Sequence, residues 1–307
     1  MKKSEYHLGV LSAGFSYLIW GLLPIYWKLL GKVSSDEILA NRVVWSFFFM
    51  LVLLVLSKKM GSLRETFMQL WQNKKQLFSL ILASILISGN WFIYIWAVNN
   101  NHMIEASLGY YINPLVSVIL GMLILKEKMT LIQYVSFLMA AIGVLVLTLS
   151  YGSFPWVSLS LALSFGLYGL AKKMIKVDSA IGLTLETMFV TPIGLLYMAY
   201  LFAQGNHSFL TISFGTDLLL IGAGVATATP LLYFAKGAQR IPLSTLGFLQ
   251  YIAPTISLLL GVFVYGEHFS KSHLLAFVFI WTALTIYSLS KTKLFDSHLK
   301  RKKELSV

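Results

Sequence analysis

Ten long apolar stretches, joined by short charged connections, are the feature of this chain that most limits its fold. A helix needs about 20 mostly apolar residues to span the hydrocarbon core of a bilayer. Only 12% of the residues are charged, against about 25% in a typical soluble domain. The sequence therefore predicts an all-α integral membrane protein with ten transmembrane helices. We expect these helices at residues 8–28, 35–57, 76–98, 103–125, 130–150, 155–173, 180–203, 215–235, 241–264 and 271–290.

Lysine and arginine are distributed unevenly over the connections, and this predicts the orientation of the chain. With the N-terminus in the cytoplasm, 20 of the 24 basic residues lie at cytoplasmic ends of helices or in the tail, 3 lie outside, and Arg42 lies within a helix. Loops on the cytoplasmic side carry an excess of Lys and Arg. We therefore expect both termini to be cytoplasmic, with the basic tail 291–307 lying against anionic headgroups.

The formal charge of +12 does not indicate a nucleic-acid partner, because the basic residues are scattered and form no groove-reading motif. The absence of cysteine excludes disulfides, thiolate metal sites and a cysteine nucleophile. No cofactor and no metal are expected, and the lipid bilayer is the one partner that composition alone indicates.

Two segments 140 residues apart repeat one pattern: YINPLVSVILGMLILKEKMT at 111–130 and YIAPTISLLLGVFVYGEHFS at 251–270. The matches are Tyr111 with Tyr251, Ile112 with Ile252, Pro114 with Pro254, Ser117 with Ser257, Gly121 with Gly261 and Glu127 with Glu267. A weaker match relates Ser16, Trp20 and Gly21 to Ser164, Tyr168 and Gly169. We infer two five-helix repeats, 1–150 and 151–290.

Because each repeat has an odd number of helices, the second must cross the membrane in the opposite direction. Its copy of the charged corner then lies outside, where lysine is disfavoured. Lys126 and Lys128 are indeed replaced by Gly266 and His268. Inverted repeats with broken helices are typical of secondary transporters, which bind their solute near the bilayer midplane between the repeats.

Pro114 and Pro254 each free the carbonyl four residues earlier, on Tyr110 and Gln250. A freed carbonyl must face protein or a wet cavity, so two interpretations stay open: a ligand site or a packing kink. Ser117 with Gly121, and Ser257 with Gly261, are predicted to be close helix contacts.

Two charges lie deep in counterpart helices of the two repeats: Arg42 in the second and Glu186 in the seventh. Intramembrane charges are costly and frequently functional. We hypothesise that both face the central cavity and that Glu186 binds a cationic group or a proton; the alternative is a purely structural role. Glu37 is predicted to form a capping box with Ser34. The corner glutamates Glu127 and Glu267 are predicted to stabilise the N-terminus of the next helix.

Aromatic and amide side chains gather in the third, fourth, eighth and ninth helices. Near helix ends they are typical of interfacial belts, but Tyr111, Asn113, Gln250 and Tyr251 lie deeper, beside the prolines. For these four, cavity lining and packing are equally open. The candidate substrate-binding residues are Arg42, Asn90, Tyr110, Tyr111, Asn113, Tyr168, Glu186, Tyr233, Gln250 and Tyr251.

The sequence gives little support to an enzyme. It contains no HExxH, no GxSxG and no glycine-rich phosphate loop. The rival to a transporter is a membrane-embedded enzyme acting on a lipid or a lipid-linked substrate. Solute that crosses a liposome membrane chemically unchanged would separate the two.

Several motifs, in order through both halves, resemble the RarD family of the EamA group within the drug/metabolite transporter superfamily. They are YLIWGLLPIYWKLL, EILANRVVWS, NWFIYIWAVNNNHMIEASLGYYINPL, LSFGLYGLAKK, GLTLETMFVTP and TLGFLQYIAPT. The resemblance covers about residues 8–290. It implies a multi-pass protein of a bacterial inner membrane, with ten helices in two repeats, that exports small metabolites or drugs.

One mechanism from that superfamily does not carry over. Small multidrug relatives exchange protons through a glutamate in the first helix, whereas here the expected helix 8–28 has no acidic residue. The sequence therefore predicts a secondary transporter, an exporter of small amphipathic solutes working by alternating access. Its energy source is left open between a proton or other coupling ion, solute exchange and downhill flow.

Overall fold

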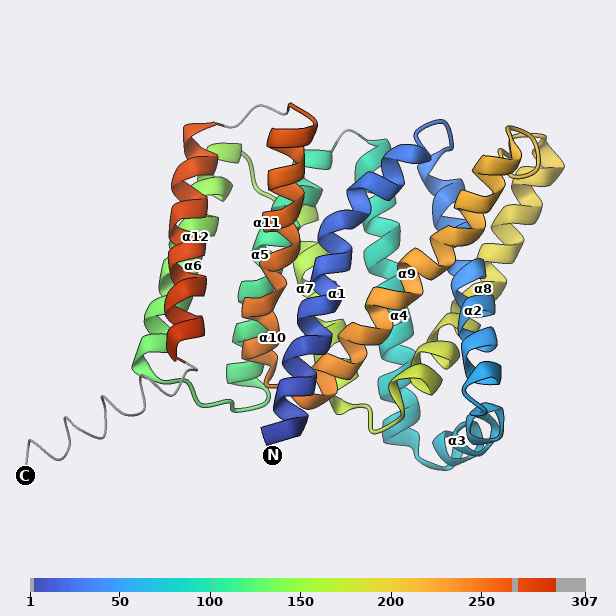
Figure 1. Ribbon diagram of the computed structural model, residues 1–307, viewed down its shortest axis with the longest axis horizontal. Helices are drawn as coiled ribbons and strands as arrows, with labels where there is room; N and C mark the ends of the chain where they lie inside the picture. The colour runs from blue at the N-terminus through green and yellow to red at the C-terminus, as the bar shows by residue number, and fades with distance from the viewer. Residues whose placement is uncertain (1–2, 101, 267–269, 291–307) are drawn as a thin grey trace, which may run out of the picture.

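The computed structural model describes residues 3–100, 102–266 and 270–290 and is helical throughout most of them (Figure 1). The helices are α1 (Lys3–Leu29), α2 (Ser35–Leu56), α3 (Met60–Gln72), α4 (Lys74–Asn99), α5 (Met103–Leu123), α6 (Leu131–Tyr151), α7 (Trp156–Met174), α8 (Ser179–Gln204), α9 (Phe214–Arg240), α10 (Leu243–Gln250), α11 (Ile252–Leu259), the π-helical turn η1 (Leu260–Val264) and α12 (Lys271–Ser290).

All ten predicted segments are helical, and the predicted all-α membrane fold is confirmed. Within the described ranges, nine spans are long and apolar enough to cross a bilayer, with α10, α11 and η1 together forming one of them. The tenth, α7, has 19 residues and carries Lys172 and Lys173 in its last turn. The first helix begins earlier than predicted, so it includes Glu5, which lies in the first turn and bonds Arg240.

The spanning helices run alternately up and down between two faces of the molecule (Figure 1). We call the face where α1, α4, α6, α8 and α10 begin the N-terminal face. The short helix α3 lies on it and was not predicted, because 13 residues cannot span a membrane. Its Phe67, Met68 and Trp71 are exposed and only Leu70 is buried, as in a helix lying along an interface.

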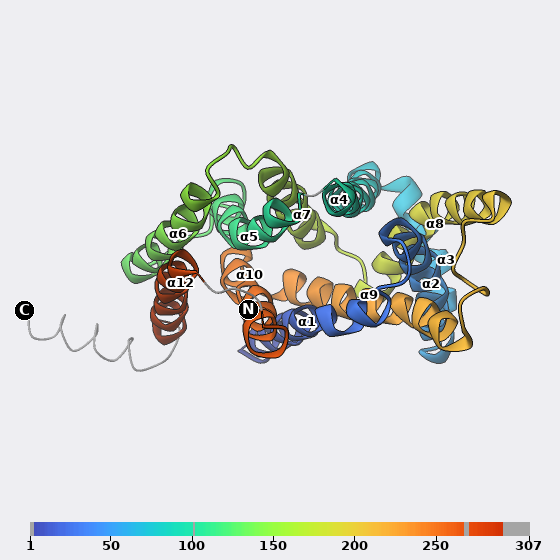
Figure 2. The same cartoon turned by 90° about the horizontal axis from the view of Figure 1, so that it is seen from above.

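The two repeats interlock instead of sitting side by side. Seen from above, α6, α5, α7 and α4 follow one another along one side, and α12, α10–α11, α1 and α9 along the other (Figure 2). Helix α7 of the second repeat thus packs between α4 and α5 of the first, and α1 packs between α9 and α11 of the second. Helices α2 and α8, which carry the two deep charges, lie near each other at one end of both rows.

The two proline segments are less alike than their sequences. Helix α5 continues through Pro114 without a break, whereas the ninth segment is interrupted at Tyr251, between α10 and α11. The two helices cross closely, since a Cβ on Gly247 would lie 2.7 Å from the Pro114 carbonyl oxygen and 3.1 Å from the Ser117 Cβ. In the second repeat, the Ser257 hydroxyl donates to the Gly21 carbonyl at 3.4 Å. The predicted contacts at Ser117 and Ser257 are confirmed.

Of the three predictions for glutamates, those for Glu127 and Glu37 were wrong, and the one for Glu267 falls outside the described residues. Glu127 caps a helix, but not the next one: its carboxylate accepts from the Leu243 and Ser244 N–H groups at 2.6 and 2.9 Å, at the start of α10. The following helix α6 is capped by Thr130 and Gln133 instead. Glu267, the counterpart of Glu127 in the second repeat, lies outside the described part of the chain, as do His268 and the tail 291–307.

The prediction of a capping box between Ser34 and Glu37 was wrong. The Ser34 side chain makes no capping hydrogen bond. The Glu37 carboxylate accepts from the Ser208 and Phe209 N–H groups at 2.7 and 2.9 Å. These belong to the connection before α9, so the carboxylate satisfies distant backbone donors in place of its own helix end.

Candidate functional site

Helices α7 and α8 bring three polar side chains together inside the bundle. The connection between them is short, so the last turns of α7 face the first turns of α8. Tyr168 and Lys172 are four residues apart and therefore share one face of α7. That face meets Glu186, which lies seven residues after Ser179, the start of α8.

The contact is a buried ion pair. The Lys172 ammonium donates to Glu186 Oε1 at 2.7 Å, and the Tyr168 hydroxyl donates to Oε2 at 3.3 Å. The Lys172 and Glu186 side chains are only 1% and 3% exposed. Each charge neutralises the other, which is how charges persist in a membrane interior. Removing one partner of such a pair is costly because the other is left uncompensated.

The charge distribution predicts Lys172 as one of the lysines at a cytoplasmic helix end, and it does not reveal that the side chain is buried in an ion pair. Its neighbour Lys173 points elsewhere, donating to the Ile241 and Ala238 carbonyls at the end of α9 at 2.5 and 3.4 Å. The signal available in the sequence was the four-residue spacing from Tyr168, which places Lys172 on the inward face of the helix.

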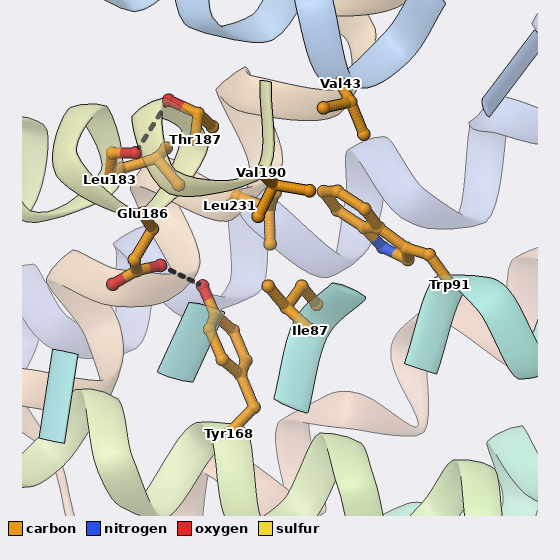
Figure 3. Close-up of a pocket in the computed structure, with 9 residues that line it drawn as sticks. All are labelled: Val43, Ile87, Trp91, Tyr168, Leu183, Glu186, Thr187, Val190 and Leu231. Carbon is orange, nitrogen blue, oxygen red and sulfur yellow. Dashed lines mark hydrogen bonds between the residues drawn. The ribbon is translucent and has the colours of Figure 1, made fainter. Parts of the chain in front are cut away.

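A small pocket adjoins the ion pair (Figure 3). Figure 3 shows the Glu186 carboxylate, hydrogen-bonded to Tyr168, at one side and the Trp91 indole at the other. The free volume is about 10 Å³, room for about one water molecule, so the pocket is closed in this conformation. It is lined by Val43, Ile87, Trp91, Tyr168, Leu183, Glu186, Thr187, Val190 and Leu231.

Arg42 lies seven residues after Ser35, the start of α2, which is the same depth in its helix as Glu186 in α8. Its Nε donates to the Thr227 hydroxyl on α9 at 2.9 Å. The guanidinium carbon lies 4.7 Å from the Trp27 ring centre and 5.5 Å from that of Trp91. Trp91 thus contacts Arg42 while also forming a wall of the pocket.

The other candidate residues fall into separate places. Tyr110 packs near Tyr94, with ring centres 6.2 Å apart, and both interact electrostatically with Arg42. Asn90 joins α4 to α7, donating to the Leu161 carbonyl and the Ser164 hydroxyl at 3.0 and 2.9 Å. Tyr110 therefore belongs with Arg42, and Asn90 holds the helix that carries Trp91.

The four residues beside the prolines lie away from this pocket. Tyr111 and Tyr251 belong to the apolar cluster formed with α6 and α12, and Tyr111 packs edge-on to Phe277. Asn113 is buried, and the Gln250 side chain accepts from the Ser117 hydroxyl at 3.4 Å. None of the four lines the pocket beside Glu186. That they bind substrate stays a prediction.

A second, larger cavity of about 350 Å³ lies between α2, α8 and α9 near the N-terminal face. Tyr233, the last of the candidates, lines it together with Lys59, Asp178 and Lys236. Lys59 and Asp178 form an ion pair at 2.7 Å. Partial burial acts to raise the pKa of Asp178, but hydrogen bonds from Lys59 and from the Ile181 and Ala180 N–H groups outweigh it and hold this pKa below its ordinary value.

Comparison with known proteins identifies the family. The model of the EamA-like transporter family matches the chain twice, at residues 7–149 and 155–289. The chain belongs to the EamA-like transporter family. Its two matches to the EamA model correspond to the two halves of the structure, and the predicted resemblance is confirmed.

Individual relatives cover nearly the whole chain. The uncharacterized transporter YojE of Bacillus subtilis (strain 168) is 51% identical, over 95% of this chain and 97% of that protein. Protein RarD of Escherichia coli (strain K12) is 44% identical, over 94% and 96%. A solved crystal structure with 20% identity superposes with a TM-score of 0.71 over 96% of this chain and 99% of the other, a likeness of fold alone. Together with the apolar helices, these matches show a multi-pass EamA-family membrane transporter.

Proposed function

We propose that this chain is a secondary transporter that exports small amphipathic solutes by alternating access. The observation that carries the proposal is the placement of Arg42 and Glu186. They lie at equal depth in corresponding helices of the two repeats, about 10 Å from opposite faces at 1.5 Å per residue. Glu186 lines the closed pocket, and Arg42 lies against Trp91, which lines the same pocket.

Inverted repeats supply the two conformations that such a cycle needs, because the packing of one repeat can be adopted by the other. In the conformation described, the pocket has room for about one water molecule, while the cavity near the N-terminal face is large enough for a small solute. A solute reaches the pocket when the surrounding helices separate on one side. For opening at the N-terminal face, contacts between the repeats on that face must loosen, such as those of Glu127 with the start of α10.

We place the protein in a bacterial inner membrane with the N-terminal face in the cytoplasm. The support is the excess of Lys and Arg on that face. Single cysteines test this cleanly, because the native chain has none. A cysteine at Asn100 or Asn206, both in exposed connections on the opposite face, should react with an impermeant reagent in intact cells. A cysteine at Lys59 should not, and its labelling would reverse the orientation.

The direct test of function is transport by purified protein in liposomes. Vesicles loaded with a bacterial metabolite extract should release particular solutes in chemically unchanged form, and deletion cells should release less of them than overexpressing cells. Solute recovered as a modified product would instead favour a membrane enzyme.

Glu186 is the residue we propose for energy coupling through a proton. The substitution Glu186→Gln keeps the shape of the side chain and removes its charge. If Glu186 carries the proton, the folded variant loses transport together with its pH dependence between about pH 5 and pH 8. Transport equal to wild type across that range would assign Glu186 a structural role.

A further inference from the structure

Arg42 lies in the interior of the bundle and has no carboxylate partner among the residues that the structure describes. The other two deep charges, Lys172 and Glu186, neutralise each other. In the described part of the chain, no carboxylate oxygen lies within ion-pair distance of the Arg42 guanidinium. Its electrostatic neighbours are the hydroxyls of Tyr94 and Tyr110. Within the described ranges, Arg42 is therefore a positive charge that no carboxylate compensates.

The free end of the guanidinium is available to a ligand. Only Nε makes a hydrogen bond within the described residues, to the Thr227 hydroxyl. This bond fixes the side chain and leaves the two terminal nitrogens, which form the fork that matches a carboxylate. The rings of Trp27 and Trp91 stabilise the cation through their faces, but they do not neutralise it.

The surroundings also fit the body of a small apolar molecule. Trp91 lines the pocket and its ring centre lies 5.5 Å from the Arg42 guanidinium carbon, and Val43, the next residue after Arg42, lines the same pocket. The remaining walls are mostly aliphatic, including Ile87, Leu183 and Leu231. An apolar ring in an opened pocket would contact Trp91 while an acidic group on it reaches Arg42.

We propose that the transported solutes are organic anions, with a carboxylate that binds Arg42 and an apolar or aromatic body that packs against Trp91. This inference rests on the proposed transport function and adds the charge class of its solute. A cationic solute meets repulsion from Arg42, and the carboxylate that would attract it, on Glu186, is already paired with Lys172.

Three probes of similar size test the charge preference: 4-methylbenzoate, 4-methylbenzamide and 4-methylbenzylammonium. Binding to the purified full-length protein in detergent is measured by calorimetry at neutral pH. We expect the carboxylate to bind most tightly, the amide more weakly and the ammonium least. Equal or tighter binding of the ammonium, or no binding of the carboxylate at millimolar concentration, overturns the proposal.

Variants assign that preference to Arg42. Arg42→Gln should weaken carboxylate binding by about 10- to 100-fold, the effect of one charge-assisted contact, while binding of the amide changes little. The matched control is Arg240→Gln, the same substitution at an arginine that is 35% exposed and paired with Glu5; this variant should bind the probes like wild type. Unchanged carboxylate binding by a folded Arg42→Gln protein contradicts the proposal.

A second variant leaves the charge in place. Thr227→Val removes the hydroxyl that fixes Arg42 and should weaken carboxylate binding by less than Arg42→Gln, retaining the order of the three probes. Size-exclusion profiles and helical circular dichroism establish that each variant is folded. If vesicles containing the wild-type protein transport only neutral or cationic metabolites, the anion inference fails while the transport function stands.

Discussion

Helices α2 and α8 are counterparts in the two repeats, yet their deep charges have different surroundings. Glu186 is enclosed, with its charge met at 2.7 Å by Lys172 of the preceding helix. Among the described residues, Arg42 bonds the Thr227 hydroxyl and lies beside aromatic rings, with no carboxylate within ion-pair distance. The preceding helix explains the difference: the alignment that matches Trp20 with Tyr168 also matches Pro24 with Lys172. In the first repeat, the position that would supply a countercharge holds a proline.

The comparison teaches that an inverted repeat preserves where a side chain lies more faithfully than what it contacts. Equal depth in counterpart helices gives the two charges similar access to the space between the repeats. Their partners come from other helices and have diverged. The site of Glu186 is internally neutral, whereas the site of Arg42, which we call the open site, lacks a carboxylate partner among the described residues. The two sites should therefore respond very differently to loss of charge.

The largest effect is expected at the neutral site. Lys172→Met leaves the Glu186 carboxylate buried with only Tyr168 as a partner, and should lower the free energy of unfolding by about 3–5 kcal/mol. Thermal and denaturant unfolding in detergent measure this loss. Combining it with Glu186→Leu removes both charges and should restore most of the stability. If the stability losses of Lys172→Met and Glu186→Leu simply add in the double variant, the pair is not coupled in the folded protein.

At the open site, the same kind of change should have a much smaller effect on stability. Arg42→Gln loses the bond to Thr227 and the contacts with two tryptophans, but it also removes an unpaired charge from the membrane interior. We expect the lost contacts and the removed charge to offset each other, with a change in unfolding free energy of about 1 kcal/mol or less. A loss as large as that of Lys172→Met would mean that Arg42 is an essential structural ion and would break the comparison.

The sequence predicted what local patterns determine. Apolar length identified ten segments that are all helical, and the offset of 140 residues identified the repeats. It did not predict partners that come from distant helices. Lys172 resembled any lysine at a helix end, and the bonds from Glu37 to Ser208 and from Glu127 to Leu243 join residues far apart in the chain. Such pairings depend on how the two repeats interlock, which no short motif encodes.

The same limit explains why the candidate binding residues divide into groups. Proline and aromatic residues made the segments around Tyr111 and Tyr251 the most conspicuous in the sequence. In the fold these tyrosines pack against α6 and α12. The pocket lies instead where α2, α4, α7, α8 and α9 converge, because α7 inserts between α4 and α5.

The smallest effect is expected at an ion pair in water, and it sharpens the contrast with the buried pair. Lys59 and Asp178 are as close as Lys172 and Glu186, at 2.7 Å, but their side chains are 43% and 41% exposed. Exposed pairs contribute about 0.2–1 kcal/mol and are weakened by salt. Asp178→Asn should therefore cost no more than this at neutral pH, because Asn retains the side-chain oxygen that caps α8.

The pH dependence gives this last prediction its sign. The pKa of Asp178 is lower in the folded protein than in the unfolded chain, so its stabilising contribution is present above the ordinary aspartate pKa of about 3.9 and is lost as the pH falls through the folded value. Wild type and Asp178→Asn should differ by a constant small amount from about pH 7 to pH 5 and converge below about pH 4. Unfolding temperatures of both proteins across this pH range, at low and at high salt, measure this difference. A difference as large as that of Lys172→Met, unaffected by salt, would show that burial alone does not separate the two pairs.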